Sequence, residues 1–229
     1  MTARIEVVRV DGGLEITRLT TNDISIVVPS SHQGLPVVSL GPQFLRDSHA
    51  SGNRTLVIPS TIAKASEEAM VSVTGIRAIN YLGDFETFNS FGWTLSTDCQ
   101  VTCADGFSFF FLAGYPMCFP RFDDEILTSH QRISEEVVMA RLMNPVHLTD
   151  DNRVRYEHYL RNRVVPMAEH AMMENDVNAL RSVIDSGLLS EGDIRKLLED
   201  SVRSGKTVIT SVLMSILNQM HSKQESLDK

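Results

Sequence analysis

The sequence predicts an α+β protein in which a short β-solenoid is followed by an all-helical domain. Three observations support this prediction. A β-branched segment that ends in Pro-Ser occurs twice, 30 residues apart. After Pro120 the apolar residues change from short runs to a helical period. A further repeat, also with an offset of 30 residues, lies in the helical half. Repeats of this length are typical of solenoids, whose units bury their apolar faces only against their neighbours.

The first repeat organises the early part of the chain. Residues 27–31 (VVPSS) align with residues 57–61 (VIPST) at an offset of 30. Phe44 aligns with Ala69 at an offset of 25, which implies a five-residue insert in the first copy, around Gly34. Each copy is expected to begin with a short strand that a proline ends, because proline lacks the N–H that a continuing ladder needs.

The remaining segments of the first half also predict short strands. Residues 1–18 are expected to form a β-hairpin around Asp-Gly-Gly. Residues 76–82 and 93–106 are expected to form a third coil and a weaker fourth coil. Phe107, Phe109 and Phe111 share one face, and Phe110 and Leu112 lie on the opposite face, which predicts a strand that is covered on both sides. We therefore assign residues 1–118 to the β-solenoid.

Helical spacing and capping residues dominate the second half. Residues 168–184 align with residues 198–214, which predicts two antiparallel helix pairs within a bundle of about five helices. Gly187 is the expected C-terminal glycine of one helix, and Gly205 with Thr207 separates the last two helices. We assign residues 122–222 to a helical domain and residues 223–229 to a tail. The expected N-caps are Ser134, Thr149, Asp176 and Ser190.

The first half resembles the BspA-type leucine-rich repeat of bacterial proteins. In that family a unit with a Gly-x-Pro-Val insert precedes units that contain Ile-Pro-Ser/Thr, as residues 24–45 and 54–70 do here. The second copy departs from the pattern, with Ala65-Ser66 in place of Ile-Gly and Met70 in place of Phe. The resemblance therefore implies a short and degenerate leucine-rich-repeat-like solenoid.

The helical half is similar to segments that follow such repeats in bacterial proteins. Its Asp176-Val-x-x-Leu180 pattern, followed by Gly187, is ankyrin-like, although the usual Thr-Pro-Leu-His signature is missing. Both repeat types serve as protein-binding scaffolds. The resemblance implies no catalytic residues.

Charge and composition exclude several classes of partner. The net charge is −8 and the pI is about 5.3, with no basic half, so a nucleic-acid backbone is not the expected partner. No apolar run approaches the roughly 20 residues that span a bilayer, and no secretory signal is visible at the N-terminus. An odd number of cysteines without an export signal predicts a cytoplasmic protein with free thiols.

Two motifs suggest a ligand-binding site, but each has a simpler structural interpretation. Cys99, Cys103 and Cys118 suggest zinc, but structural zinc uses paired ligands on both sides and Cys118 has no such neighbour. Small core residues are the favoured interpretation. The Ser-Gly-Lys-Thr run that begins at Ser204 suggests a phosphate loop, but that motif requires glycine where this chain has Asp200. A boundary between two helices is the favoured interpretation.

Acidic residues and histidines give no stronger signal. Residues 123–125 lack the alternating oxygen ligands of a calcium loop and are expected to form a solvated, helix-capping turn. The seven histidines lie outside recognised catalytic motifs, although a Ser-His-Asp site assembles from distant residues. We therefore assign no catalytic, cofactor-binding or metal-binding residue.

Most of the large aromatic residues lie between residues 81 and 122. One interpretation is that they fill the last solenoid coil and the joint to the helices. The other is that Phe88, Phe91 and Trp93, in a loop-like stretch beside two glycines, form an exposed protein-binding patch.

The predicted function is a non-catalytic intracellular scaffold for protein–protein interaction. It is expected to have a protein partner and to use no nucleic acid, membrane or cofactor. The alternative is an enzyme, a hydrolase whose site is assembled from distant residues. The identity of the partner, the biological process and the oligomeric state do not follow from the sequence.

Overall fold

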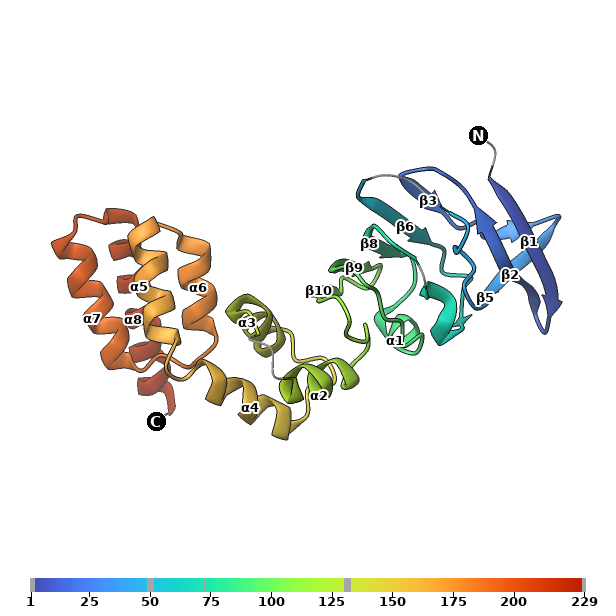
Figure 1. Cartoon of the computed structure of the whole chain (residues 1–229). Coiled ribbons are helices and arrows are strands. Elements are labelled where there is room, and N and C mark those ends of the chain that lie inside the picture. The colour runs from blue at the N-terminus through green and yellow to red at the C-terminus, as the bar shows by residue number, and fades with distance from the viewer. Residues whose placement is uncertain (1–2, 49–51, 72, 130–132, 228–229) are drawn as a thin grey trace. The chain divides into compact units, whose positions relative to one another are not determined.

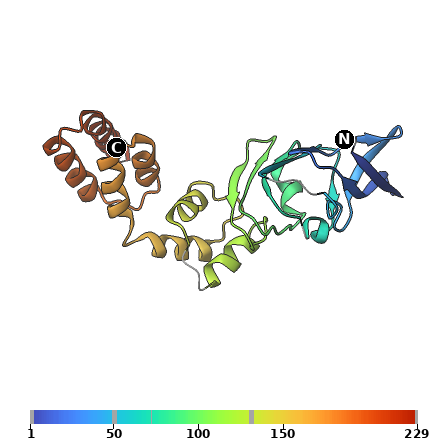
Figure 2. The same cartoon turned by 45° about the horizontal axis from the view of Figure 1, so that its top comes forward.

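We describe the chain from a computed structural model, which describes residues 3–48, 52–71, 73–129 and 133–227, with side chains up to residue 220. It contains two compact units, Met1–Ser129 and His130–Lys229, and each is described by itself. The first unit is built mainly of strands and the second of helices (Figure 1 and Figure 2). The chain is thus a mixed α+β protein with a β-solenoid-like first unit, as predicted.

Two sheets form the first unit. In one of them, β1 (Arg4–Val10) and β2 (Gly13–Thr20) form the predicted N-terminal hairpin, and β2 pairs in parallel with β5 (Leu35–Leu40). The short strands β4 (Ser31–His32) and β7 (Lys64–Ala65) also pair with β5. The other sheet has the order β10-β9-β8-β6-β3. Its strands are β3 (Ser25–Val27), β6 (Arg54–Ile58), β8 (Ile76–Tyr81), β9 (Cys99–Cys103) and β10 (Ser108–Phe111).

The strand register confirms both offsets of the sequence repeat. Val27 pairs with Val57, at an offset of 30, whereas Leu40 pairs with Ala65, at an offset of 25. The five-residue difference lies in the β4–β5 hairpin, whose turn has Gly34 in the left-handed region at φ 79°. The insert therefore forms an added hairpin and leaves the stacking of the coils intact.

The strands β3, β6, β8 and β9 are parallel and each comes from a successive coil, so the predicted third and fourth coils are present. Figure 1 shows these strands side by side. One continuous buried row crosses the whole sheet. It consists of Ile26, Leu56, Ile79, Val101 and Phe109, which lie opposite one another in register.

Aromatic rings close the end of the solenoid. The helix α2 (Arg121–Thr128) places the fully buried Phe122 with its ring centroid 5.5 Å from that of Phe109 and 5.3 Å from that of Phe111. Between β6 and β9 lie the 3-10 helix η1 (Glu67–Met70) and the short helix α1 (Phe85–Asn89). The apolar end of the last coil is therefore covered within the first unit.

The structure differs from the sequence predictions at three points in this region. Residues 123–125 do not form a solvated turn, because they lie in α2 and Asp123 is fully buried. The first compact unit includes α2 and runs to Ser129, whereas the sequence prediction ended the β-solenoid at residue 118 and began the helical domain at residue 122. The strand predicted to be covered on both sides is instead an edge strand, and Phe110 on its outer face is 45% exposed.

The described part of the second unit holds six helices, where about five were expected for the whole helical domain. All four predicted N-caps are present, since each side chain accepts a hydrogen bond from a backbone N–H in its first turn. Ser190 and Asp193 form a full capping box. The helices are α3 (Glu135–Met143), α4 (Asp150–Leu160), α5 (Val164–Glu174), α6 (Val177–Asp185), α7 (Glu191–Arg203) and α8 (Thr207–Leu227).

The helical repeat is also present in the geometry. The N–H of Asp176 donates to the carbonyl of Ala171 at 2.9 Å, and 30 residues later the N–H of Lys206 donates to the carbonyl of Ser201 at 2.9 Å. In space α5 packs on α6 and α7 on α8, while α5 also contacts α7 and α6 contacts α8. Two equivalent helix pairs are therefore stacked in the same order.

A substitution at Gly187, the glycine that ends α6, tests the assigned boundary of this helix. Gly187 has φ 72°, and a Cβ added there would meet no atom within 4 Å, so a substitution acts through backbone strain alone. We expect Gly187→Ala to lower the free energy of unfolding by about 1 kcal/mol. The control is Gly192→Ala inside α7, which we expect to raise it by about 0.5 kcal/mol. Urea denaturation measures both, and equal effects would contradict the assigned helix end.

Candidate functional site

The aromatic residues singled out from the sequence lie in the core. Phe88, Phe91 and Trp93 are each about 1% exposed, and their ring centroids lie 5.0 to 5.8 Å apart. The indole N–H of Trp93 donates to the carbonyl of Ser66 at 2.9 Å. The expected exposed patch is therefore not formed by these residues, because the rings pack on one another, and Phe88 and Phe91 also pack on Tyr81.

The cysteines also lie in the core. Cys99, Cys103 and Cys118 are free and buried. Burial raises the pKa of the Cys99 and Cys103 thiols to about 12, and it raises the pKa of Cys118 as well. A thiol is nucleophilic only as a thiolate, so these groups are inert in the folded chain.

Residues 204–207 carry no phosphate-loop geometry. Gly205 is left-handed at φ 68° and lies between α7 and α8. The Lys206 ammonium donates to the carbonyl of Met173 at 2.8 Å, at the end of α5. A cation in this position satisfies a free helix carbonyl and is favoured by the helix dipole. The lysine therefore joins the two helix pairs to each other.

One continuous surface of the first unit is the outer face of the β10-β9-β8-β6-β3 sheet. Alternate residues of a strand point to the same side, so the residues between the buried ones share this face. Two rows of five residues cross it in register. We call this surface the open sheet face. Its rows are Ser25, Thr55, Ala78, Gln100 and Phe110, and Val27, Val57, Asn80, Thr102 and Ser108.

The open sheet face carries no charged side chain. All ten residues are exposed or half-buried, and Val27 at 62% and Phe110 at 45% are the most exposed apolar side chains. Four of its six polar side chains form hydrogen-bonded pairs across strands. Thr102 donates to the Oδ1 of Asn80 at 2.8 Å, and Gln100 donates to the hydroxyl of Ser108 at 2.9 Å. These pairs lower the cost of covering the face, since four polar side chains already have a hydrogen-bond partner.

Sequence reasoning missed this face, although part of its signal was present. The repeat aligned Val27 with Val57, and both belong to one row. The other three strands lacked a readable repeat, and only the register brings their uncharged positions together. A search for uncharged residues at alternate positions of the four coils would have found most of the face.

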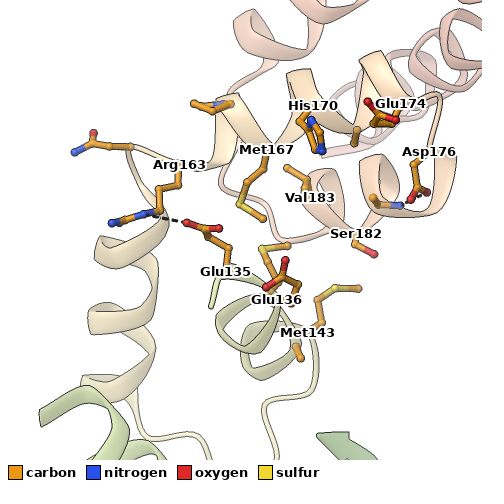
Figure 3. Close-up of a pocket in the computed structure, with 16 residues that line it drawn as sticks. Glu135, Glu136, Met143, Arg163, Met167, His170, Glu174, Asp176, Ser182 and Val183 are labelled. Atoms are coloured by element: carbon orange, nitrogen blue, oxygen red, sulfur yellow. Dashed lines mark hydrogen bonds and ion pairs between the residues drawn. The ribbon is translucent and has the colours of Figure 1, made fainter. Parts of the chain in front are cut away.

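A groove of about 750 Å³ lies in the second unit between α3 and the α5–α6 pair (Figure 3). Methionines and small residues line it, and carboxylates stand at its edges. Ser182 and His170 also line it, but no hydrogen bond joins them among the described residues, and Figure 3 draws none. The groove thus does not bring a serine, a histidine and a carboxylate into a hydrogen-bonded chain.

Two further observations concern other kinds of site. Among the described residues, no group of three or more His, Cys, Asp or Glu side chains is arranged to hold a metal ion. In the same part of the chain, no helix has the length and apolar character needed to cross a bilayer. Comparisons with protein-family models, with curated proteins and with solved structures find no match to this chain.

The buried thiols give a direct test of the core. We expect no reaction of the native chain with a thiol reagent such as Ellman's reagent at pH 8, and reaction of three thiols after unfolding. Because the folded pKa lies above the unfolded value of about 8.5, this burial contributes stability below that pH. The contribution is lost as the pH rises toward 12. A Ser96→Cys variant, with an exposed added thiol, is the control and should react at once. Rapid native labelling of wild type would contradict the structure.

Proposed function

We propose that this chain is a non-catalytic protein-interaction module that holds a protein partner on the open sheet face. The observation that carries the proposal is the absence of charge from ten exposed or half-buried positions of one continuous surface. Charged residues make up 22% of the chain, so about two would be expected among ten surface positions. The centres of protein–protein interfaces are depleted in charge in the same way.

The arrangement of apolar residues supports this function. Val27 lies on the edge strand β3 and Phe110 on the opposite edge strand β10, with less exposed and mostly polar residues on the three strands between them. The two exposed apolar side chains would contact the partner, while the shorter side chains let its surface approach closely. Because the strands form a continuous ladder, the surface is preorganised and little conformational entropy is lost on binding. The matching surface of the partner is expected to be apolar and uncharged.

The strand register and the helix packing also support a repeat type for each unit. We propose that the first unit is a degenerate leucine-rich-repeat-like solenoid and that the helix pairs of the second unit are ankyrin-like. The offsets of 30 and 25 in the strand register support the first assignment. The stacked pairs α5–α6 and α7–α8 support the second. Free thiols at all three cysteines suit a reducing cytoplasm.

Charge placed on the open sheet face tests the function. The immobilised full chain is used to retain proteins from an extract of its own cells, and Val27→Glu and Phe110→Glu are compared with wild type. Each variant should lower retention of the partner about tenfold, because a carboxylate would be buried without a counter-charge. Both residues are exposed, so melting temperatures should stay close to wild type.

The matched control is Val8→Glu, which adds the same charge to an exposed valine of β1 in the other sheet. Retention by this variant should equal that of wild type, and retention by wild type should be insensitive to salt. Equal retention by all three variants would contradict the open sheet face as the binding surface. Turnover of a metabolite in a broad activity screen, with no partner retained, would contradict the function.

A further inference from the structure

The groove of the second unit is a second concave surface, with chemistry different from that of the open sheet face. One wall is α3, and the other is formed by α5 and α6. The lining residues of α3 run from Glu135 to Met143, and those along α5 run from its N-cap Arg163 to Glu174. These spans correspond to about 12 Å and about 16 Å of helix, at about 1.5 Å per residue. The groove is therefore as long as two to three turns of another helix.

The floor of the groove is soft and apolar. Met139, Met143 and Met167 lie on both walls, with three alanines and Val183 between them. Met143 is 47% exposed although it is a large apolar residue. Methionine side chains adapt to irregular apolar partners, and grooves that they line accept amphipathic helices. Figure 3 shows Met143, Met167 and Val183 around the same space.

The edges of the groove are acidic. Four carboxylates line it, from Glu135, Glu136, Glu174 and Asp176, against one guanidinium from Arg163. That guanidinium lies 3.3 Å from the Glu135 carboxylate and also stacks on the Tyr159 ring at 4.2 Å. Glu136 and Glu174 are exposed, and neither makes an ion pair or a side-chain hydrogen bond within the described residues. The groove therefore presents uncompensated negative charge beside an apolar floor.

We infer that this groove binds an amphipathic helix of a partner protein, with an apolar face on the methionines and basic residues along its flanks. Lysine or arginine side chains of that helix would pair with Glu136 and Glu174. The inference is independent of the open sheet face, because the groove lies wholly in the second unit. A drug-sized ligand fits less well, since several lining residues, including Pro166 and His170, are exposed to solvent. A second copy of this chain, with its net charge of −8, lacks the required complementarity.

Model peptides test the inference with the full chain. The probe is a fluorescent 18-residue peptide of leucine and lysine, with leucines at helical spacing so that one face is apolar. A leucine–glutamate peptide of the same pattern and a leucine–lysine peptide with strictly alternating residues are the comparisons. Fluorescence anisotropy should show that the first peptide binds at least about tenfold more tightly than either comparison.

Charge reversal identifies the groove as the site. Glu136→Lys combined with Glu174→Lys should weaken the leucine–lysine peptide at least about tenfold and strengthen the leucine–glutamate peptide. The control combines Asp185→Lys with Glu199→Lys, which changes the net charge equally but lies outside the groove. This control should stay within about twofold of wild type. Equal weakening by the two double variants would overturn the inference, because it would show attraction to net charge alone.

A second pair of variants tests the apolar floor. Met143→Gln should weaken the leucine–lysine peptide several-fold, whereas Met214→Gln, on the equally exposed Met214 of α8, should not. Both positions are about half exposed, so both variants should fold. Equal affinity in Met143→Gln and wild type would overturn the inference. Sedimentation showing a dimer that Met143→Gln dissociates would also overturn it, in favour of a second copy as the occupant.

Discussion

The parallel register of β3, β6, β8 and β9 is the constraint on which the first unit depends. No single coil buries its own apolar side, so each strand gains its core only by lying in register on the previous one. Side chains alternate along a strand, and the register that buries Leu56 and Ile79 therefore also sets what the outer face presents. A slip of one residue would exchange the two faces. The same strand register therefore determines both the buried core and the residues of the open sheet face.

Local signals in the sequence were sufficient to predict much of this fold. The offset changed from 30 to 25 residues at Gly34, and the β4–β5 hairpin lies there. The four helix caps and Gly187 were also predictable, because a cap is decided by a few neighbouring residues. Both kinds of signal depend on residues close in sequence or on a repeated pattern.

Features that depend on distant neighbours were not predictable in the same way. Phe110 and Trp93 both lie in aromatic-rich stretches, yet Phe110 is on an edge strand and exposed, whereas Trp93 is buried against Phe88 and Phe91. The helix α2 was missed because Asp123 and its acidic neighbours suggested solvent, whereas Phe122 decides its position by packing on the last coil. The open sheet face and the groove arise only when separate strands and helices come together.

The two surfaces differ in ways that would let one chain hold two partners. The open sheet face carries no charged side chain and lies on a continuous strand ladder, whereas the groove is lined by methionines and carboxylates. The central claim is that the open sheet face is the main binding surface. Hydroxyl-radical footprinting of the free and the partner-bound chain tests it most directly, because Phe110 is an exposed and reactive ring. If the partner covers the open sheet face, oxidation of Phe110 should fall strongly in the complex, while oxidation of Val8 should be unchanged. Undiminished oxidation of Phe110 in the complex would contradict this claim.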